Sequence, residues 1–342
     1  MSLKSWLPAV GGAVLLLLSG CATTPLHPTA LPSAPRVLSR ELQDKILALD
    51  PEAVTEADVH ETLALAPAPQ VINIHGGIYP VYRAMRSFSE FLTGMGYPEA
   101  SVKLPDGKTS FSCYDGAVSI AGATAWYYEH SGLRPMIVGH SQGGMQAVKV
   151  LHHLAGHYAT NLPVWNPVTQ RAEPRFEITD PFTGAARPVV GFRLPYVTAV
   201  AAGGLTRALP NQWDLAGKLR DVPDSVEEFT GFYFGLDLLG GDALGFGPAN
   251  RYQSEGQAVV RNVRLPTRYH HGTVPSTKHL AENQQVRDWV NNYHPTDAPE
   301  FNEHFAADTA NILWGADVWH SIKKHWVREL QNLIRARRAQ KS

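Results

Sequence analysis

One serine lies between glycines at a spacing that suits a nucleophile. Residues 139–144 read Gly-His-Ser-Gln-Gly-Gly, which fits the pattern G-x-S-x-G around Ser141. The apolar run at residues 135–138 precedes this turn, and residues 145–154 follow it with the apolar spacing of a helix. A sharp strand-to-helix turn lifts the serine hydroxyl above the sheet edge, and the helix N-terminus favours a developing negative charge. The motif and its context therefore predict that Ser141 is a catalytic nucleophile.

A second glycine-containing turn follows another apolar run. Val-Ile-Asn-Ile at residues 71–74 is typical of a buried parallel strand, and it ends at His-Gly-Gly, residues 75–77. Backbone N–H groups in such a turn can face the carbonyl oxygen of a bound ester. One donor would come from Gly77 or Ile78, and the other from Gln142, the residue after the predicted nucleophile. Alone, this turn could simply end a strand, but together with the Ser141 turn about 65 residues later it predicts an oxyanion hole. In a protease, the loss of one such donor costs about 3 kcal/mol of transition-state stabilisation.

These two motifs give residues 71–156 a resemblance to the first half of an α/β hydrolase of the lipase and esterase kind, and the rest of the chain resembles that family more weakly. The resemblance implies an α/β fold with a mostly parallel sheet and helices on both of its faces. It also implies a Ser-His-Asp mechanism, with the acid after a late strand and the histidine after the last strand.

The acid that this family implies must lie downstream of Ser141. An aromatic run at residues 232–236 leads into Asp237 and resembles the strand-Gly-x-Asp segment of the family. Asp237 is therefore the predicted acid, and Asp242 is the alternative. An aspartate in such a place also suits a turn or a helix cap, which is the structural explanation of either residue.

The predicted base depends on which strand is the last. If residues 311–314 form that strand, His320 lies in the loop before the final helix, where the family has its base, and we expect His320 to be the base. If residues 258–265 are the last strand, His271 follows at a suitable distance. His279 is a third candidate. The other histidines would then be loop residues without a catalytic role.

The elements that must position these residues alternate along the chain, as in a parallel sheet with crossover helices. Strands are predicted at residues 71–74, 100–104 and 135–138, with further candidates at 189–202, 229–236 and 258–265. Helices are predicted within residues 40–65 and at residues 82–92, 117–128, 145–154, 284–293 and about 321–336. Residues 158–250 are expected to form an irregular insert after the nucleophile helix, and its polar, proline-rich beginning suits a hairpin or a cap.

The N-terminus has the pattern of a bacterial lipoprotein. Residues 1–20 contain one lysine and a short apolar run that ends in Leu-Ser-Gly-Cys, which predicts a signal peptide followed by an acylated Cys21. Residues 21–38 are rich in proline, threonine and alanine and suit a flexible tether. Ala22 resembles the residue after the cysteine in lipoproteins sent to the outer membrane. Residues 39–342 would then be a hydrolase domain anchored by lipid in the bacterial cell envelope, on its periplasmic or surface face.

Composition narrows the function classes. Hydrophobic residues make up 44% of the chain and charged residues 18%, which is an ordinary globular balance. The formal net charge of −1 argues against a nucleic-acid partner. The adjacent pairs His152-His153 and His270-His271 lack zinc-site spacing, so the sequence predicts neither a metal site nor a cofactor. With Cys21 acylated, Cys113 would have no disulfide partner.

The sequence therefore predicts a serine hydrolase that cleaves carboxylic esters through an acyl-enzyme, acting on a small-molecule or lipid ester. The histidine would take the proton of Ser141, and Asp237 would orient the imidazole. An acyltransferase with the same triad, in which an alcohol replaces water, is one alternative. A non-catalytic envelope lipoprotein on a hydrolase fold is the other.

Overall fold

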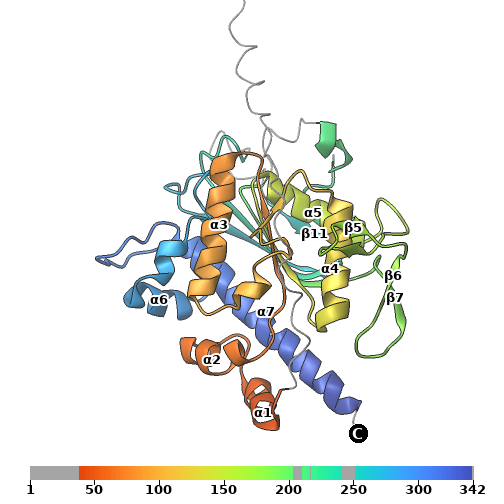
Figure 1. Cartoon of the computed structure of the whole chain (residues 1–342). Helices are drawn as coiled ribbons and strands as arrows, with labels where there is room; N and C mark the ends of the chain where they lie inside the picture. Colours follow the sequence, from red (N-terminus) through yellow and green to blue (C-terminus); the bar gives the residue numbers. More distant parts are fainter. Residues whose placement is uncertain (1–37, 203–209, 216, 241–250, 341–342) are drawn as a thin grey trace, which may run out of the picture.

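A parallel sheet of six strands forms the centre of the molecule (Figure 1). The computed structural model describes residues 38–202, 210–215, 217–240 and 251–340. The sheet has the order β12-β10-β8-β3-β1-β2, and every neighbouring pair is parallel. Its strands are β1 (Val71–His75), β2 (Phe111–Ser112), β3 (Met136–His140), β8 (Leu194–Val200), β10 (Val226–Phe234) and β12 (Val259–Leu265). The predicted α/β class with a parallel sheet is confirmed.

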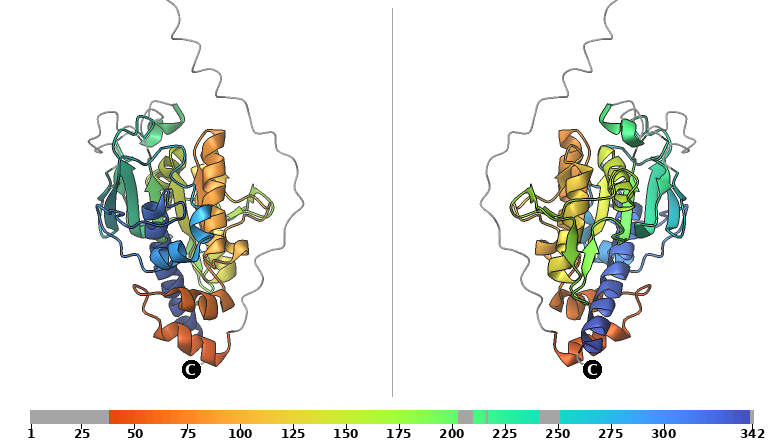
Figure 2. Two further views of the ribbon diagram at one scale, coloured as in Figure 1. Left: turned by 90° about the vertical axis from the view of Figure 1, so that its left-hand side faces the viewer. Right: turned by 90° about the vertical axis from the view of Figure 1, so that its right-hand side faces the viewer.

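Helices cover both faces of this sheet because alternate strand residues point to opposite faces. Val71 belongs to the apolar cluster with α3 (Tyr79–Gly94) and α7 (Ile312–Ala339). Its neighbour Ile72 belongs to the cluster with α4 (Ala117–Ser131) and α5 (Gln142–Leu154). Figures 1 and 2 show the two helical layers on either side of the strands. The remaining described helices are α1 (Arg40–Ala48), α2 (Glu56–Glu61), α6 (Gln284–Asn291), η2 (Leu63–Leu65), η3 (Glu99–Ser101), η5 (Pro210–Leu215) and η7 (Lys278–Ala281).

The 28-residue helix α7 is the main support of one face. Three of its tryptophans, Trp314, Trp319 and Trp326, are fully buried. Trp314 and Trp326 contact the rings of Phe88 and Tyr97, with ring centroids 4.8 and 4.7 Å apart. Figures 1 and 2 show α1 beside the C-terminal end of α7. Large aromatic side chains of this kind contribute much of the burial energy of a core.

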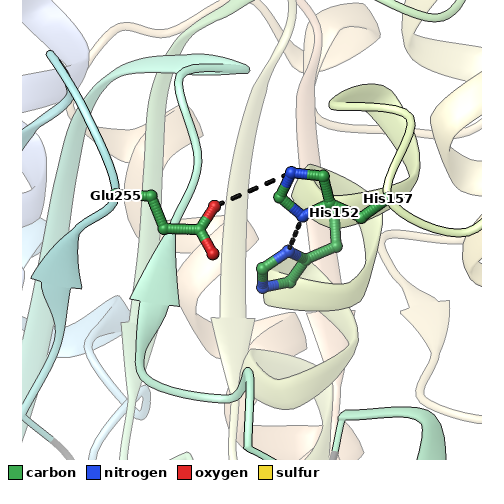
Figure 3. A group of neighbouring side chains, drawn as sticks. All are labelled: His152, His157 and Glu255. Atoms are coloured by element: carbon green, nitrogen blue, oxygen red, sulfur yellow. Dashed lines mark hydrogen bonds and ion pairs between the residues drawn. The ribbon is translucent and has the colours of Figure 1, made fainter.

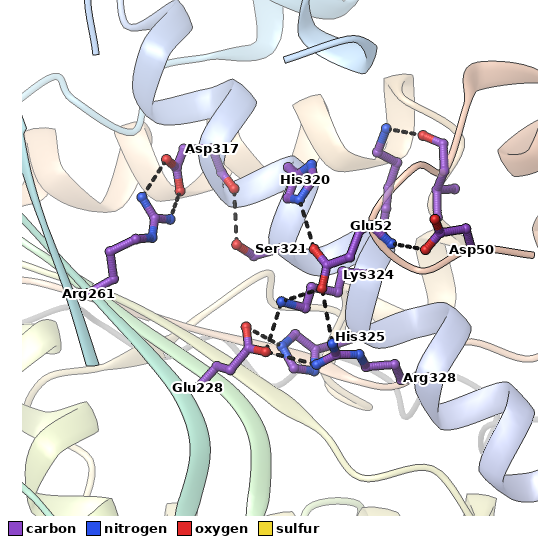
Figure 4. A network of polar contacts seen from close by, with 12 residues as sticks. Asp50, Glu52, Glu228, Arg261, Asp317, His320, Ser321, Lys324, His325 and Arg328 are labelled. Carbon is purple, nitrogen blue, oxygen red and sulfur yellow. Dashed lines mark hydrogen bonds and ion pairs between the residues drawn. The ribbon is translucent and has the colours of Figure 1, made fainter. Parts of the chain in front are cut away.

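Ion pairs also join α7 to the sheet (Figure 4). Glu228 on β10 lies 2.8 Å from both Lys324 and Arg328 and 3.2 Å from His325. Burial alone would raise the pKa of the Glu228 carboxyl, but the hydrogen bonds and positive charges of His325 and Lys324 hold that pKa well below its usual range. The carboxylate is therefore ionised and fixes α7 against β10.

The predicted insert at residues 158–250 is wrong as a single unit, because β8 and β10 lie within it and belong to the central sheet. Its first part does leave the sheet, as the hairpin or cap prediction expected. β4 (Trp165–Asn166) pairs with β5 (Arg171–Ala172), and β6 (Glu177–Thr179) pairs with β7 (Ala186–Pro188), both antiparallel. Further on, β9 (Asp221–Val222) pairs with β11 (Gln253–Ser254) in a separate parallel two-stranded sheet.

The strand predicted at residues 100–104 is also wrong. Prolines bound this segment, and the N–H groups of Ser101 and Val102 donate to the carbonyls of Pro98 and Glu99 at 2.9 and 3.1 Å. These local bonds form η3, so the amides are not available for a strand ladder. The short strand β2, some ten residues later, pairs with β1 instead.

The strand predicted at residues 311–314 is wrong: Asn311 is the N-cap and residues 312–314 begin α7, which is therefore longer than the predicted helix at about 321–336. A short apolar run does not distinguish a strand from the start of a buried helix. Asn311 adopts a left-handed conformation with φ 63° before the helix begins. The last strand of the central sheet is therefore β12.

The other predicted elements of the sheet and of its flanking helices are confirmed within a few residues at their ends. None of the described helices combines the length and the apolar character that crossing a membrane requires. The predicted signal peptide, the acylated Cys21 and the tether up to residue 37 lie outside the described residues.

Replacing Trp326 by alanine should lower the free energy of unfolding by about 3–5 kcal/mol, because it leaves a cavity in a packed core. The change also removes the hydrogen bond from the indole Nε1 to the Pro67 carbonyl, 3.0 Å long. Urea denaturation followed by circular dichroism measures the loss. Leu65→Ala is the control, since Leu65 is 55% exposed and should change stability by about 0.5 kcal/mol or less. Equal losses in the two variants would contradict the role given to α7.

Candidate active site

Ser141 occupies a strained turn between β3 and α5. Its backbone has φ 57° and ψ −128°, and its N–H donates to the Val200 carbonyl of the neighbouring strand at 2.9 Å. A positive φ is rare for a residue with a side chain and marks positions that the surrounding structure must hold. This backbone conformation directs the Ser141 hydroxyl away from the sheet, toward the loops that follow β10 and β12.

Close backbone contacts explain the glycines on either side of this turn. A Cβ atom on Gly139 would lie 2.6 Å from the Gly143 carbonyl oxygen, and one on Gly143 would collide with the Ile74 carbonyl of β1. A Cβ on Gly76 would lie 2.8 Å from the Ser141 Cβ. The turns after β1 and β3 are therefore pressed together, and only glycine permits that approach.

His271 and Asp237 complete a chain of hydrogen bonds with Ser141. His271 Nε2 lies 2.7 Å from the Ser141 Oγ, and its Nδ1 lies 2.9 and 3.1 Å from the two carboxylate oxygens of Asp237. The two side chains are 9% and 2% exposed, so solvent hardly screens the contact. A carboxylate only accepts hydrogen bonds, which fixes the proton of a neutral His271 on Nδ1. Nε2 then has a lone pair that faces the serine hydroxyl.

A turn at the end of β10 positions Asp237. Leu236 has φ 64°, so the chain reverses directly before the carboxylate. The Gly240 N–H donates to Asp237 Oδ1 at 2.8 Å. Asp237 is thus a turn residue as well as the partner of His271, so its structural role does not exclude a catalytic one.

His140, which the sequence analysis did not select, holds the loop that carries His271. Its side chain is fully buried, and burial lowers the pKa of its imidazole well below the usual value. Its Nε2 lies 2.6 Å from the His271 carbonyl oxygen. Since a carbonyl only accepts, this neutral ring donates from Nε2. No sequence signal beyond its position next to Ser141 could have identified this role.

The structure places the Gln142 side chain next to Gly77, the two residues predicted to supply the oxyanion donors. A Cβ on Gly77 would lie 2.9 Å from the Gln142 side-chain Oε1. Gln142 is the first residue of α5, whose opening N–H groups have no acceptor within the helix. The buried thiol of Cys113 donates to Gln142 Oε1 at 3.4 Å, and burial raises the pKa of that thiol to about 12. The thiol stays neutral and keeps the amide side chain in place.

The other candidate residues lie apart from Ser141. His320, the expected base, lies on α7, 3.6 Å from Glu52, and burial lowers the pKa of its imidazole to about 4. The choice of His320 depended on a last strand at residues 311–314 that is not formed, so the structure corrects it in favour of His271. His279 contacts the Ala310 carbonyl instead. Asp242 lies outside the described residues.

Apolar side chains are exposed on the loops that carry these groups. Tyr79 follows the turn after β1, and Leu236 and Leu238 flank Asp237; each is more than 60% exposed. Tyr114 is also exposed, and its hydroxyl lies next to Gly77. Large exposed apolar groups gathered on functional loops often mark a binding surface.

Comparison of the sequence with models of known protein families finds no match, and a search of curated proteins finds none either. The chemistry of the site is therefore argued from its geometry.

Gly143→Ala should destabilise the turn and disturb the placement of Ser141, because the added methyl group collides with the backbone of β1. We expect a loss of about 2 kcal/mol or more in the free energy of unfolding, within the range for overpacking. Gly116→Ala is the matched control, since its Cβ would meet only the Ser119 Oγ at an ordinary 3.6 Å. Thermal melts compare the two, and a Gly143→Ala variant as stable as Gly116→Ala would refute the close approach.

Proposed function

We propose that the chain is a serine hydrolase that cleaves carboxylic esters, with Ser141 as nucleophile, His271 as base and Asp237 as the acid that orients the base. One observation carries the proposal. His271 contacts the Ser141 hydroxyl through Nε2 and the Asp237 carboxylate through Nδ1, at 2.7 and 2.9 Å. Nucleophile, base and orienting acid within hydrogen-bond reach are the recognised signature of nucleophilic catalysis.

The first step transfers an acyl group to the serine. Ser141 Oγ attacks the carbonyl carbon of the ester while His271 Nε2 takes its proton, and Asp237 stabilises the resulting imidazolium. The developing oxyanion is placed near the backbone N–H groups of Gly77 and Gln142, at the N-terminus of α5. The protonated His271 then gives its proton to the leaving alcohol oxygen, which leaves an acyl-enzyme.

Water completes the reaction. His271, neutral again, removes a proton from a water molecule that attacks the acyl-enzyme, and the carboxylic acid leaves as Ser141 regains its proton. An alcohol in place of water would make the same site an acyltransferase. The strained backbone of Ser141 favours a catalytic protein over a non-catalytic one, because strain of this kind persists where it serves a site.

The exposed apolar side chains favour an ester with an apolar acyl or alcohol part. Leu236 and Leu238 lie on both sides of Asp237 in the chain, and Tyr79 lies two residues after Gly77. An apolar substrate that covers them gains about 25 cal/mol per Å² of apolar surface removed from water. Small esters and lipid esters both fit this chemistry.

We also propose that the chain is anchored by lipid at Cys21 in the bacterial cell envelope, with the outer membrane as its location. This proposal depends on the sequence pattern Leu-Ser-Gly-Cys and on the proline-rich, flexible tether predicted after it. An acyl anchor would keep the site close to lipid esters in the same membrane.

Ser141→Ala should abolish hydrolysis of p-nitrophenyl esters and labelling by a fluorophosphonate probe. His271→Ala should lower kcat by at least about 10⁴-fold, because the serine then lacks its base. Asp237→Asn should cost about 10⁴-fold, because the amide favours the wrong imidazole tautomer. Steady-state kinetics of the purified chain on short- and long-chain esters measures these losses.

His320→Ala is the matched control and should keep activity close to that of the parent. Loss of activity in this variant with the His271→Ala variant still active would overturn the assignment of the base. A parent chain that hydrolyses no ester and takes no label would overturn the enzymatic proposal itself.

Growth of a bacterial expression host with radiolabelled palmitate should label the chain, and Cys21→Ala should remove the label. Cys113→Ser is the control and should retain it, because the Cys113 thiol is buried beside Gln142. Label in the Cys21→Ala variant, or none in the parent, would show that the lipoprotein pattern is a coincidence.

A further inference from the structure

The C-terminal end of α5, opposite to Ser141, brings two histidines together (Figure 3). His152 lies in the last turn of the helix, and His157 follows after Gly156, which has φ 80°. The His157 N–H donates to the His152 carbonyl at 3.0 Å, and the Gly156 N–H donates to the His153 carbonyl at 2.9 Å. This pair of bonds is a Schellman cap, so the backbone itself holds the two imidazoles side by side. Their Nδ1 atoms lie 2.8 Å apart.

The contacts of His152 define which of its nitrogens is free to bind a ligand. Its Nε2 lies 3.1 Å from the Lys218 carbonyl oxygen, which only accepts, so Nε2 carries the proton. The ring is fully buried, and with the proton on Nε2 the Nδ1 atom of the neutral imidazole carries a lone pair. An imidazole that donates one N–H to a backbone carbonyl and presents the other nitrogen is the usual state of a metal ligand.

Glu255 supplies a carboxylate on the other side of His157. Its Oε2 lies 3.8 Å from His157 Nε2, and it follows β11, far along the chain from α5. One atom from each of the three side chains can be chosen so that all lie within 4.8 Å of one another. His157 and Glu255 are about one-third exposed, so an ion can enter from solvent. His152, by contrast, is fully buried and fixed.

We propose that His152, His157 and Glu255 form a binding site for a divalent transition-metal ion, with Zn²⁺ as the best match. Two imidazoles and a carboxylate are ligands that zinc prefers, and water would fill the fourth position. Bonds of about 2.0–2.1 Å place two nitrogens about 3.3 Å apart in a tetrahedral site, so the histidines must separate by only about 0.5 Å. The Glu255 carboxylate now lies nearest to His157 Nε2, so this exposed side chain would have to turn toward Nδ1 to bind the same ion.

The charges around the cluster bear on this proposal in opposite directions. The C-terminal end of α5 carries a partial negative charge that favours a cation. The Lys218 ammonium opposes one, but it lies over the Tyr158 ring, 5.0 Å from its centroid. Without a metal, the His157 Nδ1–H fills the gap and donates to His152 Nδ1. The ion would take the place of that proton, and the neutral His157 ring would then carry its proton on Nε2.

A metal at this place would join two parts of the structure. α5 supplies His152, whereas Glu255 follows the strand β11, which pairs with β9. Met145 of α5 and Leu215, Asp221 and Gln253 line a cavity of about 360 Å³ between these parts. The ion would therefore brace the wall of this cavity against α5. The adjacent pair His152-His153 lacks zinc-site spacing in the sequence, but in the fold His152 lies beside His157 instead.

Isothermal titration calorimetry with Zn²⁺ tests the proposal on the purified full chain. The protein is produced without a polyhistidine tag. The parent should bind one equivalent more than the His157→Asn variant, and Glu255→Gln should weaken the site by at least about 10-fold. His153→Asn is the matched control on the same helical turn and should bind Zn²⁺ as the parent does. Zn²⁺ should also raise the melting temperatures of the parent and of His153→Asn. The increase for His157→Asn should be much smaller.

Equal Zn²⁺ uptake by the parent and by His157→Asn would overturn the proposal, because the ions would then lie elsewhere on the chain. Failure of the parent to bind would leave the histidines as a proton-linked pair and would also overturn it. Both His157 and Glu255 are surface residues on separate segments, so the Glu255→Gln variant decides the matter if His157→Asn fails to fold. None of these measurements depends on ester hydrolysis.

Discussion

The contact between the turns after β1 and β3 is the constraint on which the rest of the site depends. Ser141 has a positive φ, and its turn leaves no room for a side chain at Gly143, against the Ile74 carbonyl, or at Gly76, against Ser141 itself. The hydrogen bond from the Ser141 N–H to Val200 adds a third strand to this contact. Backbone packing thus positions the proposed nucleophile and the turn that would supply the oxyanion donors.

The position of His271, the proposed base, depends on contacts from several elements. His271 follows the last strand of the sheet, β12, and reaches Ser141 because His140 holds its carbonyl and Asp237 holds its ring. β10 and β12 in turn are fixed by α7. Glu228 of β10 pairs with Lys324 and Arg328, and Arg261 of β12 forms a bidentate ion pair with the buried Asp317. α7 therefore helps to position His271, the proposed base, although it contributes no residue to the proposed triad.

The sequence predicts features that depend on neighbouring residues, and it misses those that depend on contacts between distant segments. The Ser141 turn and the His-Gly-Gly turn are local strand-turn motifs, and the strands and helices around them are found where the spacing predicted them. Asp237 was also selected, because an aromatic strand led directly into it. The choice of His271 required knowledge of which strand is the last. The apolar run at residues 311–314 is as compatible with a strand as with the start of a buried helix. Likewise, His152 and His157 meet only because Gly156 caps a helix, which adjacency in sequence does not reveal.

The helix α5 has chemically distinct ends, with Ser141 before its first residue and the His152–His157 pair at its cap. Its 13 residues span about 20 Å at a rise of about 1.5 Å per residue. Most of its residues are buried and packed against neighbouring elements, so the helix moves as one rigid body. A displacement of its C-terminal cap would therefore be transmitted to the Ser141 turn.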